Sequence, residues 1–153
     1  MEKRKLKRRN IIKIIALQWK ENSGKTATLK LLIDLMKSKY SVIEQSNGRG
    51  FDCWAKFDVN GKTVAICTAG DLESIIEKSL NKIGKSDLFV CAVHTFGDTV
   101  KCLYRHADKQ DVYLYGRIFY TNSGENLFDV QKEQKAVNDY QAKYLFDKIV
   151  AII

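Results

Sequence analysis

Two spacings of apolar residues alternate along the chain. Continuous or every-second apolar positions are typical of strands, and apolar positions three and four apart are typical of helices. The first spacing predicts strands at residues 10–17, 51–58, 62–68, 88–93 and 112–120. The second spacing predicts helices at residues 25–38, 71–82, 98–107 and 126–151. Residues 41–50 are polar and are interpreted as a loop between the first helix and the second strand.

The strand at 51–58 and the last helix both have a clear apolar side. In the strand, Ala55 and Phe57 should face one way and Trp54 and Lys56 the other, because strand side chains alternate. In the last helix, four apolar or aromatic positions are expected to face inward. They are Val137, Tyr140, Tyr144 and Leu145.

The second and third strands are expected to form a hairpin. Asn60-Gly61 stands between them, and this dipeptide favours a tight turn. The strand at 62–68 is more continuously apolar, so it should lie nearer the middle of the sheet. The order of elements predicts one three-layer α/β domain over residues 10–153. Its sheet should be mainly parallel and five-stranded, with one antiparallel strand and helices on both faces.

The junction between the first strand and the first helix carries the strongest chemical pattern. Gly24-Lys25-Thr26 follows an apolar strand and precedes an amphipathic helix. This arrangement resembles the phosphate-binding loop of the P-loop NTPase superfamily, whose pattern is G-x-x-x-x-G-K-[ST]. The chain departs from it at one position, because Trp19 stands where the pattern has its first glycine.

The resemblance implies a role for each residue of the loop. Backbone N–H groups would cradle the phosphates at Asn22, Ser23, Gly24, Lys25, Thr26 and Ala27. The Lys25 ammonium would neutralise the β- and γ-phosphates, and the Thr26 hydroxyl would bind a phosphate-coordinated Mg²⁺. The expected ligand is therefore Mg²⁺ with ATP or GTP.

The same tripeptide occurs again at Gly61-Lys62-Thr63, in a different setting. It follows Asn60 and leads into a strand, so it belongs to the hairpin turn and is expected to have no phosphate role.

The layout also resembles that of small GTPases, and a second segment supports this. Residues 67–71 read Cys-Thr-Ala-Gly-Asp and are similar to the D-T-A-G-Q segment of that family. The resemblance implies that strand 62–68 lies near the first strand and that the Gly70 N–H contacts the γ-phosphate. Cys67 replaces the Mg²⁺-associated aspartate, and Asp71 replaces the water-orienting glutamine. No guanine-reading Asn-Lys-x-Asp motif follows the fifth strand, so ATP is favoured over GTP and slow hydrolysis is expected.

Four further residues each have a functional and a structural interpretation. Asp71 either orients water or a metal-bound water, or caps the helix that follows. Asp52 is a rival metal carboxylate or a solvent-facing strand residue. Arg49 is a charge-stabilising finger for the γ-phosphate or a solvated loop arginine. His94 ends the fourth strand and either relays a proton or is a hydrogen-bonded histidine at the sheet edge.

The charge of the chain is concentrated at its start. The formal net charge is +8, and residues 1–9 hold six basic side chains against one acidic one. Such a leader is expected to be disordered and to bind nucleic acid or an acidic membrane surface; the alternative is that it is merely solvated. No run approaches the roughly 20 apolar residues of a membrane span.

The four cysteines have no zinc-binding spacing and are expected to be reduced thiols in a cytoplasmic protein.

The sequence favours binding of a nucleoside triphosphate with Mg²⁺, with slow hydrolysis or a nucleotide-dependent switch. Two alternatives remain open. The first is a kinase for a small molecule or a nucleotide, in which loop 41–50 would bind the acceptor. The second is a non-catalytic nucleic-acid-binding adaptor. The oligomeric state is not determined by the sequence.

Overall fold

The computed structural model describes residues 12–18, 25–46, 53–68, 81, 85–93, 99–116 and 127–153. For residues 127–133 and Thr99 it describes the backbone alone. The elements in chain order are β1 (Lys13–Gln18), α2 (Lys25–Lys39), β2 (Ser41–Gln45), β3 (Trp54–Val59), β4 (Lys62–Cys67), β5 (Leu88–Val93), α4 (Thr99–Leu103), the short 3-10 helix η1 (Lys109–Asp111), β6 (Val112–Gly116) and α5 (Leu127–Ile152).

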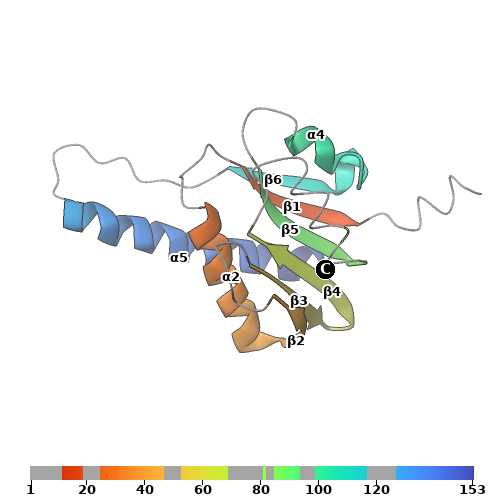
Figure 1. Ribbon diagram of the computed structural model, residues 1–153, viewed down its shortest axis with the longest axis horizontal. Helices are drawn as coiled ribbons and strands as arrows, with labels where there is room; N and C mark the ends of the chain where they lie inside the picture. The colour runs from red at the N-terminus through yellow and green to blue at the C-terminus, as the bar shows by residue number, and fades with distance from the viewer. Residues whose placement is uncertain are drawn as a thin grey trace, which may run out of the picture.

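The strands form one mixed sheet with the order β2-β3-β4-β5-β1-β6 (Figure 1). The pairs β4–β5, β5–β1 and β1–β6 are parallel, whereas β3 is antiparallel to both of its neighbours. The predicted α/β class and the mainly parallel sheet are therefore confirmed, as is the central place of β4.

The predicted number of strands is wrong, because the described part of the chain forms six strands and not five. The sixth is β2, within the stretch that the sequence assigned to a loop. All five of its residues are exposed, so no alternation of burial marks it. It is a strand because it pairs with β3 from Ser41 opposite Asp58 to Gln45 opposite Ala55. The Ser46 N–H extends this ladder by donating to the Trp54 carbonyl at 2.9 Å.

The predicted hairpin between β3 and β4 is confirmed. Asn60 and Gly61 have φ angles of 53° and 88°, which is the left-handed geometry of a tight hairpin turn. The Asp58 carboxylate fixes the turn by accepting a hydrogen bond of 2.9 Å from the Gly61 N–H.

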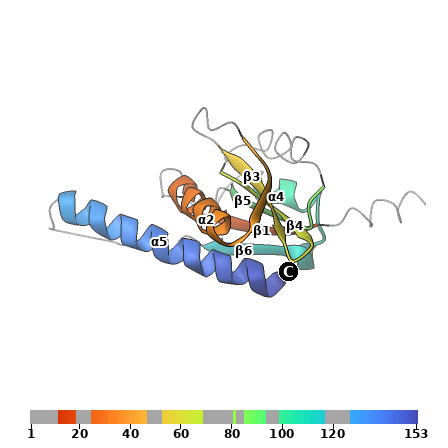
Figure 2. The same cartoon turned by 90° about the horizontal axis from the view of Figure 1, so that it is seen from below.

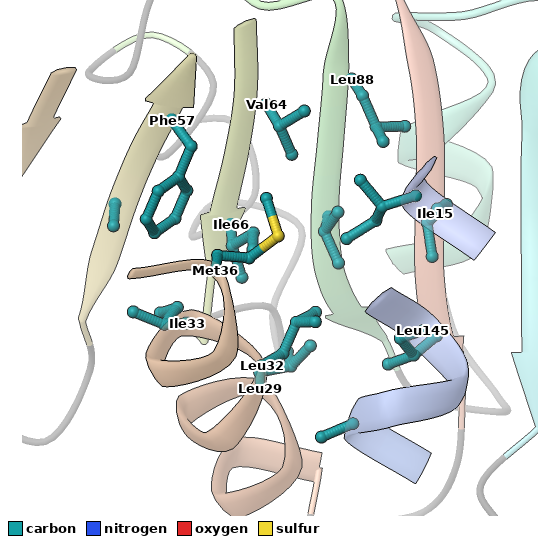
Figure 3. Packing of buried hydrophobic residues seen from close by; sticks show 14 of the residues in the cluster. Ile15, Leu29, Leu32, Ile33, Met36, Phe57, Val64, Ile66, Leu88 and Leu145 are labelled. Carbon is teal, nitrogen blue, oxygen red and sulfur yellow. The ribbon is translucent and has the colours of Figure 1, made fainter. Parts of the chain in front are cut away.

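The larger core lies between one face of the sheet and the helices α2 and α5 (Figure 3). The predicted helix 25–38 agrees with α2, and its stripe of Leu29, Leu32, Ile33 and Met36 is buried. On this face of the sheet, Ile15, Phe57 and Ile66 are fully buried as well. Burial of this stripe is what stabilises α2, since isolated helices of this length are marginal in water.

The opposite face of the sheet is covered by α4 and carries a second core. Cys67, Cys91 and Cys102 are buried there, and together with Cys53 they are free thiols, as predicted. Burial raises the pKa of the Cys91 thiol far above its usual range, and the neighbouring Cys67 and Cys102 add to this. The Cys91 thiol therefore acts as a small apolar side chain, because its reactive thiolate is strongly disfavoured.

Helix α5 packs against α2, and its N-terminal half extends past α2 and the sheet (Figure 2). Leu145 is buried as predicted, but Tyr140 is 62% exposed, so its predicted inward orientation is wrong. Tyr140 lies off the side of α5 that carries Ala142, Leu145 and Ile149 into the core. The Tyr144 ring instead contacts the Tyr115 ring of β6 edge-on, with 5.8 Å between centroids.

Other predictions fall wholly or largely outside the described residues. They include the leader at 1–9 and the helix at 71–82, of which Asn81 alone is described and is helical. Within the described residues, no helix is both long enough and apolar enough to cross a membrane.

Candidate functional site

The chain connections that follow β1 and β5 run toward opposite edges of the sheet. After β1 the chain continues through α2 to β2 at one edge, whereas after β5 it continues through α4 to β6, beyond β1. The two helices cover opposite faces. In open α/β sheets, ligands bind outside the carboxyl ends of the strands where connections diverge in this way. The ends of β1 and β5 are therefore the candidate site.

Three strand ends are aligned at this edge. Gln18, the last residue of β1, pairs with Val93, the last of β5, and with Gly116, the last of β6. Gln18 and Val93 therefore lie side by side at this edge. The predicted phosphate loop and His94 follow them along the chain and lie outside the described residues.

Lys25 is the first residue of α2 and is only 5% exposed. The Lys25 ammonium thus belongs to the N-terminal end of α2, where the helix dipole is itself positive. The first turn of α2 holds no acidic residue. A bound anion would be stabilised by both the Lys25 charge and the helix terminus, so the electrostatics of this position favour a phosphate ligand.

The residues that follow Lys25 in the first turn of α2 differ in solvent exposure. Thr26 is half-buried and Ala27 is exposed, while Thr28 is fully buried. The Thr28 hydroxyl donates to Oδ1 of Asn138 on α5 at 3.4 Å. Thr26 is therefore the threonine of this turn that is accessible to a ligand, as the predicted Mg²⁺ contact requires. Trp19, Asn22, Ser23 and Gly24 lie outside the described residues.

Helix α5 also contacts the end of β6. The Gln141 side chain is buried, and its Nε2 donates to the Gly116 carbonyl at 2.9 Å. Gly116 in turn pairs with Gln18. Helix α5 is therefore hydrogen-bonded to the strand that pairs with β1 at the last residue of β1, Gln18.

The expected position of the second motif is wrong in one respect. The sequence placed strand 62–68 near the first strand, but β5 lies between β4 and β1. The end of β4 is also occupied locally. The Thr68 N–H donates to the Cys53 carbonyl, and the Thr68 hydroxyl accepts from the Cys53 N–H, both at 2.9 Å. Cys67 is buried on the α4 face. These two residues are thus part of the sheet and its core.

Several predicted site residues lie outside the described residues. They are Arg49, Asp52, Gly70, Asp71 and His94. Of the predicted metal ligands, Thr26 is described, and no group of three potential metal-binding side chains (histidine, cysteine, aspartate or glutamate) occurs within the described part of the chain.

Three residues of this region escaped the sequence analysis: Thr28, Asn138 and Gln141. Asn138 and Gln141 are three positions apart, on the side of the last helix that also carries Ala142 and Leu145. Amide side chains within an apolar stripe are the signal that could have revealed them, because a buried amide requires a hydrogen-bond partner.

Comparison of this chain with known protein families, with curated proteins and with solved structures gives no match.

Proposed function

We propose that the protein binds a nucleoside triphosphate with Mg²⁺ at the carboxyl ends of β1 and β5. The observation that carries the proposal is the position of Lys25. It is buried, it begins α2, and α2 follows the strand at which the chain connections diverge. Charge, helix terminus and topology favour an anion at the same place.

The roles within the loop follow from this placement. The backbone N–H groups of residues 22–27 surround the phosphates, and the Lys25 ammonium neutralises them. The accessible hydroxyl of Thr26 completes the coordination of Mg²⁺. Trp19 in place of glycine gives the loop entry a bulky aromatic residue. The nucleotide we propose is ATP, because the guanine-reading motif is absent from the sequence.

Chemistry on the bound triphosphate is proposed to be slow, or to serve as a switch. Cys67 cannot replace the metal-associated aspartate, because it is buried in the second core. The strand order favours His94 over Asp71 as the group nearest the phosphates, since β5 adjoins β1 and β4 does not. Asp52 and Arg49 remain secondary candidates. The free cysteines agree with a reducing, cytoplasmic setting.

The two Gly-Lys-Thr tripeptides supply a matched test. Lys25→Ala should weaken binding of Mg²⁺-ATP by about tenfold or more, as expected when a charge-assisted contact of ~1.5–3 kcal/mol is removed. Lys62→Ala changes the same residue in the same tripeptide, but at an exposed turn, and should leave the affinity unchanged. Calorimetric titration measures both. Equal losses in the two variants, or no binding by the wild-type protein, would rule out the proposal.

A further inference from the structure

Helix α5 is hydrogen-bonded to α2 and to β6, the strand that pairs with β1 at the start of the predicted phosphate loop. Gln141 donates to the carbonyl of Gly116 in β6, which pairs with Gln18, the last residue of β1. Asn138 accepts the hydrogen bond of Thr28 in the first turn of α2. Two amides of one helix, three residues apart, therefore contact α2 directly and β1 through its neighbour β6.

The polarity of these contacts needs an explanation. Gln141 is 1% exposed and Thr28 is 0% exposed, and both lie beside an apolar core. Apolar side chains of similar size would fill this space without the desolvation cost of burying polar groups. A hydrogen bond, however, fixes a direction and a register that apolar packing does not. The buried Gln141 amide and the buried Thr28 hydroxyl are thus better explained by the placement of β6 and α2 than by a gain in stability.

We propose that Asn138 and Gln141 are positioning residues. Asn138 holds the first turn of α2, which carries Lys25 and Thr26, and Gln141 holds the end of β6 beside the end of β1, before the ligand arrives. The inference rests on the proposed function and adds to it the reason why α5 contributes to affinity. A loop whose two ends are already fixed loses less conformational entropy on binding, so the same contacts give a tighter complex. The Thr28–Asn138 and Gln141–Gly116 hydrogen bonds are together called the clamp. Without the clamp, the first turn of α2 and the end of β1 are held by the rest of the fold alone.

The clamp can be removed with little change in shape. Thr28→Val deletes the hydroxyl, Asn138→Leu and Gln141→Leu delete the amides, and Thr28→Ser retains the hydroxyl. Gln134→Leu is the matched control, because it makes the same glutamine-to-leucine change in α5 at an exposed position. Three quantities are measured for each variant: the dissociation constant for Mg²⁺-ATP, amide hydrogen exchange, and the midpoint of thermal unfolding.

We expect Thr28→Val, Asn138→Leu and Gln141→Leu each to weaken Mg²⁺-ATP binding by about threefold to tenfold, the effect of one net hydrogen bond. Amides of residues 29–32, which bond to the carbonyls of the first turn of α2, should exchange faster in the two variants that break the Thr28–Asn138 bond, with the unfolding midpoint little changed or raised. Thr28→Ser and Gln134→Leu should behave like the wild-type protein. The double variant Thr28→Val/Asn138→Leu should bind no more weakly than the worse single variant, because one shared bond is lost.

Two results would overturn the clamp. One is unchanged affinity and unchanged exchange in all three amide and hydroxyl deletions. The other is a loss of affinity in Thr28→Val and Asn138→Leu that adds in the double variant. If the wild-type protein binds no triphosphate, the proposed function fails, and amide hydrogen exchange alone tests the clamp. Faster local exchange in Thr28→Val at an unchanged midpoint of thermal unfolding supports the clamp. Exchange at the wild-type rate contradicts it.

Discussion

The chain uses Gly-Lys-Thr twice, and the two copies have different surroundings. Lys25 is buried at the start of α2, whereas Lys62 is exposed at the start of β4. Thr26 continues into a helix, whereas Thr63 lies in a strand, where its N–H donates to Asp87 at 2.8 Å. Before the first copy the chain leaves a buried parallel strand, and before the second it passes through a two-residue turn. The tripeptide therefore acquires its meaning from the elements on either side.

The largest expected effect concerns the helix that gives the first copy its setting. Leu32 is fully buried in the stripe of α2, and Leu32→Ala should reduce the free energy of unfolding by about 2–5 kcal/mol, through lost burial and a residual cavity. Chemical denaturation measures the change. The exposed Lys30 lies on the same helix, and Lys30→Ala should change stability little. A loss below about 0.5 kcal/mol at Leu32 would show that α2 is not anchored by this stripe.

The next effect concerns hydrolysis at the first copy. Turnover of Mg²⁺-ATP should be slow, well below the roughly 10 s⁻¹ of a typical enzyme. His94→Gln should lower it further by about tenfold or more if His94 acts as a proton relay. Asp71→Asn should lower it less, because the strand before Asp71 is separated from β1 by β5. A phosphate-release assay compares the variants. Fast unassisted turnover, or a larger loss in Asp71→Asn, would reverse this order.

A smaller effect is expected at the turn of the second copy. Gly61 has a φ of 88°, and an added Cβ would meet no atom within 4 Å. Gly61→Ala should therefore cost about 1–2 kcal/mol from backbone strain alone. Gly116→Ala is the control, since its Cβ would also meet nothing within 4 Å and its φ is not positive. Denaturation should leave Gly116→Ala near the wild-type stability. Equal stability of the two variants would contradict the assigned turn.

The smallest effect on stability is expected from the leader, which belongs to neither copy. Six basic residues within residues 1–9 should give salt-sensitive affinity for nucleic acid or acidic lipid. On duplex DNA the logarithm of the binding constant should fall with log salt by about 0.9 per phosphate contacted. Deletion of residues 1–9 should remove this affinity and leave thermal stability and ATP binding unchanged. Absence of binding at low salt would mean that the leader is merely solvated.

The local pattern of the sequence predicted individual elements well. Helix α2 was placed within one residue at its end, and β5 was placed at residues 88–93. Helix α2 carries an apolar stripe and β5 is a continuous apolar run, and both are bounded by polar or turn-forming residues. The candidate loop was also found from sequence, because a strand, a Gly-Lys-Thr turn and an amphipathic helix are all local features.

The pattern did not predict β2, because a strand exposed on every residue has no side to bury. The local pattern also did not predict the strand order. Whether β4 or β5 adjoins β1 depends on pairing between segments far apart in the chain, and the apolar residues of either strand would fit. For that reason the sequence indicated Gly70 and Asp71 as residues near the γ-phosphate. The strand order instead favours His94, which follows β5.

What the sequence determined by itself is which residues form strands, turns and helices, since side-chain periodicity and turn chemistry act over a few residues. Tertiary structure alone decided which strand ends align with the end of β1, that Tyr140 faces solvent, and that Asn138 and Gln141 reach Thr28 and Gly116. The physical reason is that burial and hydrogen bonding between distant segments are set by how whole faces pack together, and a face becomes defined only when its partner is in place.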